Sequence, residues 1–401
     1  MLNDSRAMGR RIAAERKKRG LSQKEFGSLV DRSETWVSQV ERGVRKIDRM
    51  SVLERVAEVL DVPLAELAPD VPVAAVSPEK PEVVSDLALA LTSSDALCAV
   101  LQRSQDVDVE KMVDSAILAW DYTHSSSYDQ LGELLLEVLP DMERAARSTA
   151  GKDQKRLFAS LAKSYHAAAA VLSKVGETSA AWVAADRAIS AAERANDPLL
   201  MAEGAFRLTL VFQGARWFEL ARRTASTAAE ALSSVQSKDN PAALSLWGAL
   251  NLQLAVVAAR IDEGDEAYER LQDAQDAAAT LGKDRNDYDT EFGPTNVKLH
   301  EVAVAVELGD AGRAIRVGES LDASSLSAER QARLLIDLAR AHTQRRNLDG
   351  AVSCLRRADQ IAPQQVRSHA LVRAVLADLT QSGFSDSPDL RQLVADLGLP
   401  I

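Results

Sequence analysis

The chain has 401 residues, of which 27% are charged, 46% belong to the hydrophobic class and only 4% are aromatic. This length excludes a single small core and leaves two or three domains or a repeat array. Because aromatic residues are scarce and alanine supplies much of the apolar content, the composition favours closely packed helices over β-sheets.

The net charge of −11 is unevenly distributed along the chain. Residues 1–49 carry 13 Lys and Arg and 7 Asp and Glu, a net charge of +6. Residues 69–401 carry 34 basic and 48 acidic residues, a net charge of −14. A basic N-terminal part on an acidic body indicates that only the N-terminal part meets a polyanion.

The first predicted elements are short helices within residues 5–68. Ser22 and Glu25 have the spacing of a capping box, which predicts a helix beginning at Gln23 that buries Phe26 and Leu29. The next three residues, 31–33, form a predicted turn, and Ser33 is placed to cap a second helix.

The second of these helices has two distinct faces. Its apolar side chains are Trp36, Val37 and Val40, whereas the opposite face carries Glu34, Thr35, Ser38, Gln39 and Arg42. A short helix with hydroxyl, amide and guanidinium groups on its outer face suits the DNA major groove, where those groups read base edges.

Several short motifs carry a family resemblance: Leu21-Ser22-Gln23, Phe26-Gly27, Val37-Ser38 and Val40-Glu41-Arg42-Gly43. Residues 7–67 resemble the helix-turn-helix of the Xre/lambdoid-repressor group. The resemblance implies that Gln23 contacts phosphate, that residues 34, 35, 38 and 39 face bases, and that Arg16 and Glu41 form an internal ion pair. Arg32, Arg42, Arg45 and Lys46 complete the predicted DNA-binding set.

Two positions depart from the pattern of that family. Asp31 stands where the family usually has glycine in the turn, and aspartate tolerates a left-handed conformation. Gly27 replaces the usual alanine, and we expect this change to loosen the helix slightly.

A linker and a long helical region follow the predicted helix-turn-helix domain of residues 1–68. Residues 69–83 contain four prolines without helical periodicity, which predicts an extended linker. Residues 84–401 are almost wholly helical in pattern, with breaks every 38–50 residues or so, as in stacked helical hairpins. Pro198, Pro241, Pro294 and Pro363 lie near predicted helix starts.

The hairpin over residues 332–365 is the best formed. Its large, small and proline residues are spaced as in the tetratricopeptide repeat, which it resembles. The same spacing of four and then three positions occurs at Ala267, Leu271 and Ala274. The predicted fold is therefore all-α, an N-terminal helix-turn-helix domain plus a tetratricopeptide-like α-solenoid. A generic α-solenoid is the alternative if the repeats are irregular.

The sequence offers no clear catalytic or metal-binding motif. Walker, GxGxxG, HExxH and CxxC strings are missing, and the five histidines lack ligand spacing. Ser160-x-x-Lys163 is interpreted as a chance match, and the acidic loop 286–293 as solvated rather than as a cation site. We expect no enzyme activity, cofactor or metal.

Localisation is predicted from three features. The N-terminus has no apolar signal segment, and Cys98 and Cys354 are interpreted as buried thiols. The apolar span 241–260 is interrupted by polar residues and is interpreted as a buried helix rather than a membrane span. We expect a cytoplasmic protein without membrane contact.

A DNA-binding head joined to helical repeats resembles the peptide-pheromone receptor regulators of Gram-positive bacteria, and the composition also resembles actinobacterial regulators of this architecture. The resemblance implies a transcription regulator that binds a palindromic operator in double-stranded DNA as a homodimer and senses a peptide or small effector. The alternative is that the repeats are a protein-interaction scaffold without a small ligand.

The predicted effector site lies on the first helices of the repeats, which line the concave surface of a solenoid. Asn251 and Asn296 each lie 13 residues before a glycine break, and so occupy equivalent places. Asparagine both donates and accepts hydrogen bonds, which matches a peptide backbone. Arg207 and His300 are the other predicted ligand contacts. The alternative is that both asparagines satisfy only neighbouring backbone groups.

Overall fold

The structure is a computed structural model that describes residues 2–30, 32–45, 47, 50–60, 62, 82–91, 108–380 and 387–398. All regular elements within these ranges are helices, and β-pairing there is limited to two isolated bridges. The predicted all-α class is confirmed. The chain divides into a larger compact unit, residues 78–375 and 387–399, and a smaller one with residues 1–77, 376–386 and 400–401.

Four helices form the N-terminal part of the smaller unit: α1 (Leu2–Lys18), α2 (Gln23–Leu29), α3 (Glu34–Glu41) and α4 (Met50–Val59). Their common core consists of Ile12, Phe26, Val30, Trp36, Val37, Val40, Val56, Ala57 and Leu60. The core is small and apolar, and it packs α2 against α3, the two helices whose starts the capping signals predict.

The predicted caps are present. The Ser22 backbone N–H donates to Glu25 and the Glu25 backbone N–H donates to Ser22 Oγ, at 2.8 and 3.1 Å. Ser33 caps α3 through the backbone N–H of Trp36, at 3.1 Å. The prediction for Leu29 was wrong, because 44% of this residue is exposed at the end of α2.

Gly27 has a packing role that its helix propensity does not reveal. A Cβ at this position would lie 2.6 Å from the Arg32 carbonyl oxygen, closer than real Cβ atoms approach. Glycine thus lets the turn before α3 close over α2, so the expectation that Gly27 merely loosens the helix needs correction.

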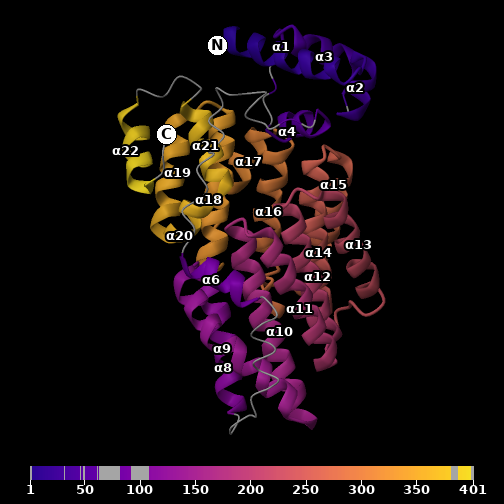
Figure 1. The fold of residues 1–401 in the computed structure, drawn as a ribbon, viewed down its shortest axis with the longest axis vertical. Helices are drawn as coiled ribbons and strands as arrows, with labels where there is room; N and C mark the ends of the chain where they lie inside the picture. The colour runs from indigo at the N-terminus through magenta and orange to yellow at the C-terminus, as the bar shows by residue number, and fades with distance from the viewer. Residues whose placement is uncertain are drawn as a thin grey trace. The chain divides into compact units, whose positions relative to one another are not determined.

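The larger unit is a stack of helical hairpins (Figure 1). After α6 (Glu82–Ala90), its hairpins are α8/α9, α10/α11, α12/α13, α14/α15, α16/α17 and α18/α19. The bounds are Val109–His124, Tyr128–Ser148, Gly151–Lys174, Thr178–Ala195, Pro198–Gly214, Phe218–Leu232, Pro241–Arg260, Gly264–Leu281, Pro294–Glu307, Ala311–Glu319, Ala328–Gln344 and Leu348–Ile361. The 3-10 turn η1 (Asp287–Asp289) lies between α15 and α16, and α20 (Pro363–Ser368), α21 (Ala370–Leu379) and α22 (Pro388–Leu397) complete the described helices.

Each first helix packs on the first helix of the next hairpin, from α8 through α10, α12, α14 and α16 to α18. This arrangement confirms the predicted tetratricopeptide-like solenoid. Alanine makes the close approach possible: the buried residues of α11 are all alanine. The predicted prolines at 198, 241, 294 and 363 each begin a helix.

The row of first helices closes on itself, because α18 also contacts α8. Beside this contact, Ser126 Oγ donates to Gln365 at 2.9 Å and the backbone N–H of Tyr128 donates to Gln364 at 2.6 Å. Lys174 pairs with Glu329 at 3.2 Å. The interior of the body is thus surrounded by first helices.

Helix α14 is long and apolar enough to cross a membrane, but 89% of its most apolar window is buried within the protein. Its length and composition therefore serve the core of the solenoid, as predicted. The predicted linker, residues 69–83, lies mostly outside the described residues. Its last two residues, 82 and 83, belong to α6, which begins at Glu82. Cys354 is buried as a free thiol, whereas Cys98 lies outside the described residues.

Candidate functional site

The first candidate site is the outer face of α3. Glu34 and Thr35 are exposed, and Ser38 and Gln39 are partly exposed, whereas Val37 and Val40 on the opposite face are buried. The polar side chains therefore stand together on a helix whose back is fixed to the core. Hydroxyl and amide groups in this arrangement are available to base edges in a major groove.

A buried ion pair fixes the two ends of the helix-turn-helix. Arg16 Nε donates to Glu41 Oε1 at 2.5 Å and Nη2 donates to Oε2 at 3.1 Å, with both side chains less than a tenth exposed. The pKa of Arg16 is raised, chiefly by its hydrogen bond to Glu41. Arg16 Nη1 also donates to the Leu21 carbonyl at 2.5 Å, so α1, the α2 cap and the end of α3 are tied together. The ion pair that the resemblance implied is confirmed.

Other predicted DNA-binding side chains have intramolecular contacts. Gln23 Nε2 donates to Glu41 Oε2 at 2.6 Å, and Arg42 Nε donates to the Ser38 carbonyl at 3.1 Å. Arg32 lies over the Trp36 ring at 5.9 Å. Arg45 is exposed just after α3, and Lys46 lies outside the described residues. Their roles toward DNA stay predictions.

The second candidate site is the interior of the body, where Arg207 of α12 is 5% exposed. Its guanidinium lies 4.4 Å from the centre of the Trp120 ring on α8 and 4.9 Å from that of Phe206. Its Nη2 donates to the Asp289 carbonyl at 2.6 Å, and Nε faces Glu203 at 3.6 Å. A cation held between aromatic rings and a carboxyl is a preorganised anchor for an anionic or carbonyl-bearing ligand.

Burial dominates the electrostatics around Arg207. It raises the pKa of Glu203 to about 8, although the Arg207 charge opposes this. It lowers the pKa of His166 to about 3, assisted by Arg207, and it also lowers the pKa of Arg207 itself. His166 and Glu203 approach to 3.9 Å. At neutral pH the cluster thus contains a neutral imidazole and a largely protonated carboxyl beside the guanidinium, and both neutral groups are able to donate hydrogen bonds.

The three other predicted ligand residues are buried. Asn251 Nδ2 donates to the Trp247 carbonyl at 2.9 Å, and Asn296 Nδ2 donates to the Glu291 carbonyl at 2.5 Å. Each Oδ1 is buried without a hydrogen-bond partner. His300 Nδ1 lies 2.9 Å from the Asn296 carbonyl and Nε2 lies 3.3 Å from Gln253, while burial lowers the pKa of His300 to about 3.

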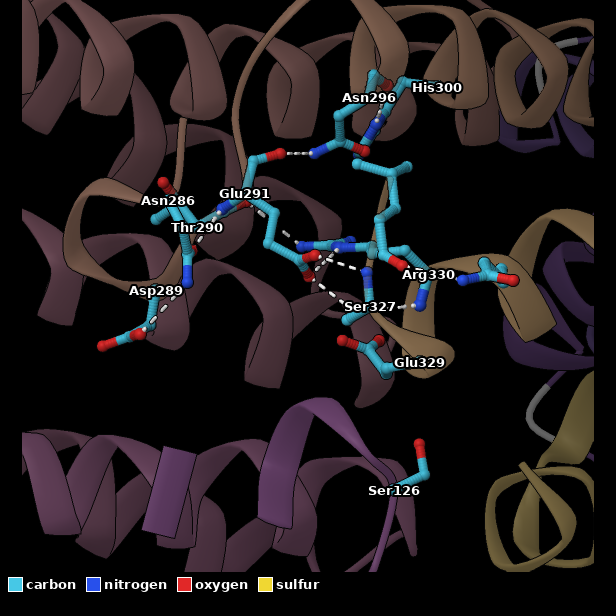
Figure 2. Close-up of polar contacts among 12 residues, drawn as sticks. Ser126, Asn286, Asp289, Thr290, Glu291, Asn296, His300, Ser327, Glu329 and Arg330 are labelled. Carbon is cyan, nitrogen blue, oxygen red and sulfur yellow. Dashed lines mark hydrogen bonds and ion pairs between the residues drawn. The ribbon is translucent and has the colours of Figure 1, made fainter. Parts of the chain in front are cut away.

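The acidic loop between α15 and α16 is solvated only in part: Asn286 is exposed and Asp287, Tyr288, Asp289 and Glu291 are partly exposed. Thr290 and Phe292 are fully buried, and the backbone N–H of Arg285 donates to the Phe292 carbonyl at 2.9 Å, which closes the loop at its base. Figure 2 shows Asn296, Ser327 and Arg330 around Glu291. Within the described residues, no group of three or more His, Cys, Asp or Glu is placed to hold a metal ion.

Sequence reasoning missed Glu203, Trp120, Glu291 and Arg330. One signal was available: Glu203 and Arg207 are the only ionisable residues of α12 and lie four positions apart, which places both on one buried face. No local signal marks Glu291, because its partners Ser327 and Arg330 are 36 and 39 positions away.

Comparison with known families identifies the N-terminal part. Residues 7–69 match the family described as "Helix-turn-helix domain". This part of the chain is therefore a helix-turn-helix domain, and with the helical-repeat body it gives the chain the architecture of a DNA-binding regulator. No curated protein matches the chain in sequence.

Three solved structures are similar to the chain at low identity. The Rap protein complexed with competence and sporulation factor is 13% identical with a TM-score of 0.42, covering 72% of this chain and 89% of that chain. PlcR of Bacillus thuringiensis, in complex with a peptide and DNA, is 14% identical with a TM-score of 0.29, covering 69% and 96%. ComR of Streptococcus suis is 11% identical with a TM-score of 0.24, covering 89% and 96%. With TM-scores below 0.5, these likenesses establish neither fold nor function.

Proposed function

We propose that this chain is a cytoplasmic, sequence-specific DNA-binding transcription regulator and has no enzyme activity. The observation that carries the proposal is the outer face of α3: its polar side chains are exposed on a capped helix whose apolar back is buried. In this role Glu34, Thr35, Ser38 and Gln39 face bases in the major groove.

Phosphate contacts come from residues around that helix. Gln23, Arg32, Arg42 and Arg45 surround α3, and Lys46 follows in sequence. The positive charge of residues 1–49 attracts DNA, whereas the acidic body is repelled by it. This division keeps the body away from the duplex and available for regulation.

We further propose a homodimer on a palindromic operator, because one short recognition helix reads too few bases for useful specificity. The body offers an apolar surface for the second copy. Trp182 and Trp217 are 45% and 43% exposed with ring centres 5.9 Å apart. Val183, next to Trp182, and Leu220, three residues after Trp217, are also exposed. Light scattering tests this: we expect the mass of a dimer for the wild type and of a monomer for Trp182→Ser combined with Trp217→Ser. A wild-type monomer, both free and on DNA, would contradict dimerisation.

The body interior is the proposed effector site, where Arg207, Asn251, Asn296 and His300 would bind a peptide or small molecule. Buried polar atoms without a hydrogen bond support this role, because native proteins rarely leave such atoms unsatisfied. They include Trp120 Nε1, His124 Nε2, Arg207 Nε, Asn251 Oδ1 and Asn296 Oδ1.

Genome-wide mapping of bound DNA, combined with a thermal-shift screen of peptides and metabolites, tests the whole proposal. We expect discrete bound sites that share a palindromic motif, and a ligand-induced rise in melting temperature that Arg207→Lys abolishes. Bound sites without a common motif would contradict the regulator. A co-purifying protein instead of a ligand shift would favour a scaffold.

A further inference from the structure

We propose that residues 286–291 are an internal pseudo-ligand: they fill the effector site of the body, and the effector that displaces them is an acidic peptide. The inference rests on the proposed effector site and adds the chemical class of its ligand. It is carried by the way in which three helices bind this segment.

Three successive carbonyl groups of the loop are bound by three buried side chains from different helices. The Asp289 carbonyl accepts from Arg207 of α12 at 2.6 Å, and the Glu291 carbonyl accepts from Asn296 of α16 at 2.5 Å. The Thr290 carbonyl between them accepts from Arg330 of α18 at 3.5 Å. Backbone carbonyls are the groups that any peptide offers, so the same side chains can bind a peptide supplied in trans.

The groups that bind the Glu291 carboxylate are the reason for expecting an acidic peptide as the effector. Its Oε1 accepts from the backbone N–H of Ser327 and its Oε2 from Ser327 Oγ, both at 2.8 Å, at the start of α18 (Figure 2). Arg330 Nε adds an ion pair at 3.5 Å. A helix N-terminus with an arginine beside it favours a carboxylate, and three of the six loop residues are acidic.

The loop satisfies this site incompletely. Arg207 Nε and Asn296 Oδ1 are buried without a hydrogen bond although both side chains bind carbonyl groups of the loop. Tyr288, Asp289 and Glu291 have φ values of 50°, 55° and 49°, in the left-handed region that residues other than glycine rarely adopt. A peptide with an unstrained backbone and a better match therefore has an advantage over the tethered segment.

The anchors of the loop lie outside the displaced segment. Phe292 is buried against Gly248 of α14, where a Cβ would lie 2.1 Å from the ring. Asp284 accepts from the backbone N–H and the hydroxyl of Thr295, at 3.0 and 2.6 Å. Residues 286–291 are thus able to leave the interior while both ends remain attached.

The test uses the full chain and a fluorescein-labelled peptide, RNDYDTEF, which copies residues 285–292. Glu291→Gln weakens the internal segment by removing its charge. We expect this variant to bind the peptide about tenfold more tightly than the wild type does in fluorescence anisotropy, the effect of one charge-assisted hydrogen bond. Adding Arg207→Lys should abolish the gain. Glu269→Gln, an exposed carboxylate on α15, is the matched control and should bind as the wild type does.

Should Glu291→Gln lose its helical circular dichroism, Tyr288→Phe replaces it, because this change removes only the hydrogen bond from Tyr288 to Asp197 at 3.3 Å. Equal peptide affinity for the wild type and the folded variant would overturn the pseudo-ligand. A gain that survives Arg207→Lys would overturn it as well. Since peptide binding is measured without DNA, either failure leaves the regulator proposal to be decided by its own DNA and ligand experiments.

Discussion

Arg16 and Glu41 lie 25 positions apart and form a two-pronged ion pair beneath the surface of the helix-turn-helix domain. Glu41 also accepts from Gln23, so one carboxylate links the end of α3 to α1 and to the first residue of α2. The orientation of the recognition helix therefore depends on this carboxylate.

Replacing Glu41 with alanine should destabilise the N-terminal unit strongly. The change removes both hydrogen bonds from the Arg16 guanidinium to Glu41 and leaves only its bond to the Leu21 carbonyl, which costs about 1–3 kcal/mol. Hydrogen exchange of the full chain, read at the backbone amides of α3, measures the loss. Glu34→Ala on the exposed face of α3 is the control, and equal stability of the two variants would contradict the role of the pair.

Gly27→Ala should also destabilise this unit, although alanine is the better helix former by about 1 kcal/mol. The new methyl group would lie 2.6 Å from the Arg32 carbonyl oxygen. Overpacking of this kind costs about 1–3 kcal/mol, which exceeds the gain in propensity. Ser28→Ala on the exposed side of α2 provides the comparison, and a Gly27→Ala variant as stable as Ser28→Ala would refute the close approach.

The pH dependence of stability should report on Glu203. Burial raises its pKa from 4.5 to about 8 in the folded protein, so the folded state holds a proton that the unfolded state releases. Stability is therefore greatest below pH 4.5 for this group and is lost as pH rises to 8, by up to about 1.4 kcal/mol per pH unit. The pKa of His166 is lowered from 6.5 to about 3, so its contribution to stability increases with pH, but only between pH 3 and 6.5.

Denaturation between pH 6.5 and 8 isolates the contribution of Glu203. We expect the wild type to lose stability across this window, and Glu203→Gln to show a flatter profile because glutamine does not titrate. A variant profile parallel to that of the wild type would mean that Glu203 is ionised in the folded protein.

Gln364 should stabilise the junction between the first and last hairpins of the body, where α18 contacts α8. Its Oε1 accepts from the backbone N–H groups of Tyr128 and Asp129, at 2.6 and 3.3 Å, and its Nε2 donates to the Asp129 carboxylate at 2.7 Å. Gln364→Ala should accelerate hydrogen exchange at the Tyr128 and Asp129 amides by about tenfold, since each loses its acceptor. Gln392→Ala on α22 should leave these amides unchanged, and the same rates in both variants would show that the ends are held without Gln364.

How much of this structure could be predicted from sequence differs between the two units. The caps at Ser22 and Ser33 and the helix starts at proline are local signals, and all were confirmed. The Arg16–Glu41 pair came from a family resemblance, because no local pattern joins residues 25 positions apart. The burial of Leu29 was predicted wrongly, since helical periodicity alone does not show where a short helix leaves the core.

The interior site could be predicted only in part. Arg207, Asn251, Asn296 and His300 were placed on first helices and are buried there, and their ligand role stays a prediction. The acidic loop 286–293 was interpreted as solvated, whereas Thr290 and Phe292 within it are buried. Its burial depends on Arg207, 82 positions from Asp289, and on Ser327, 36 positions from Glu291, and such long-range pairings leave no trace in local composition.

Selection of bound duplexes from a random-sequence library by the full chain tests the central claim most directly. We expect enrichment of a palindromic motif, and Thr35→Ala with Ser38→Ala should relax the preference at defined positions while general affinity persists. Arg45→Ala should instead weaken binding to every sequence. It should also lower the slope of log affinity against log salt concentration by about 1, the loss of one phosphate contact. If the wild-type chain enriches no motif, or if the α3 double variant selects the same motif as the wild type, the regulator account is contradicted.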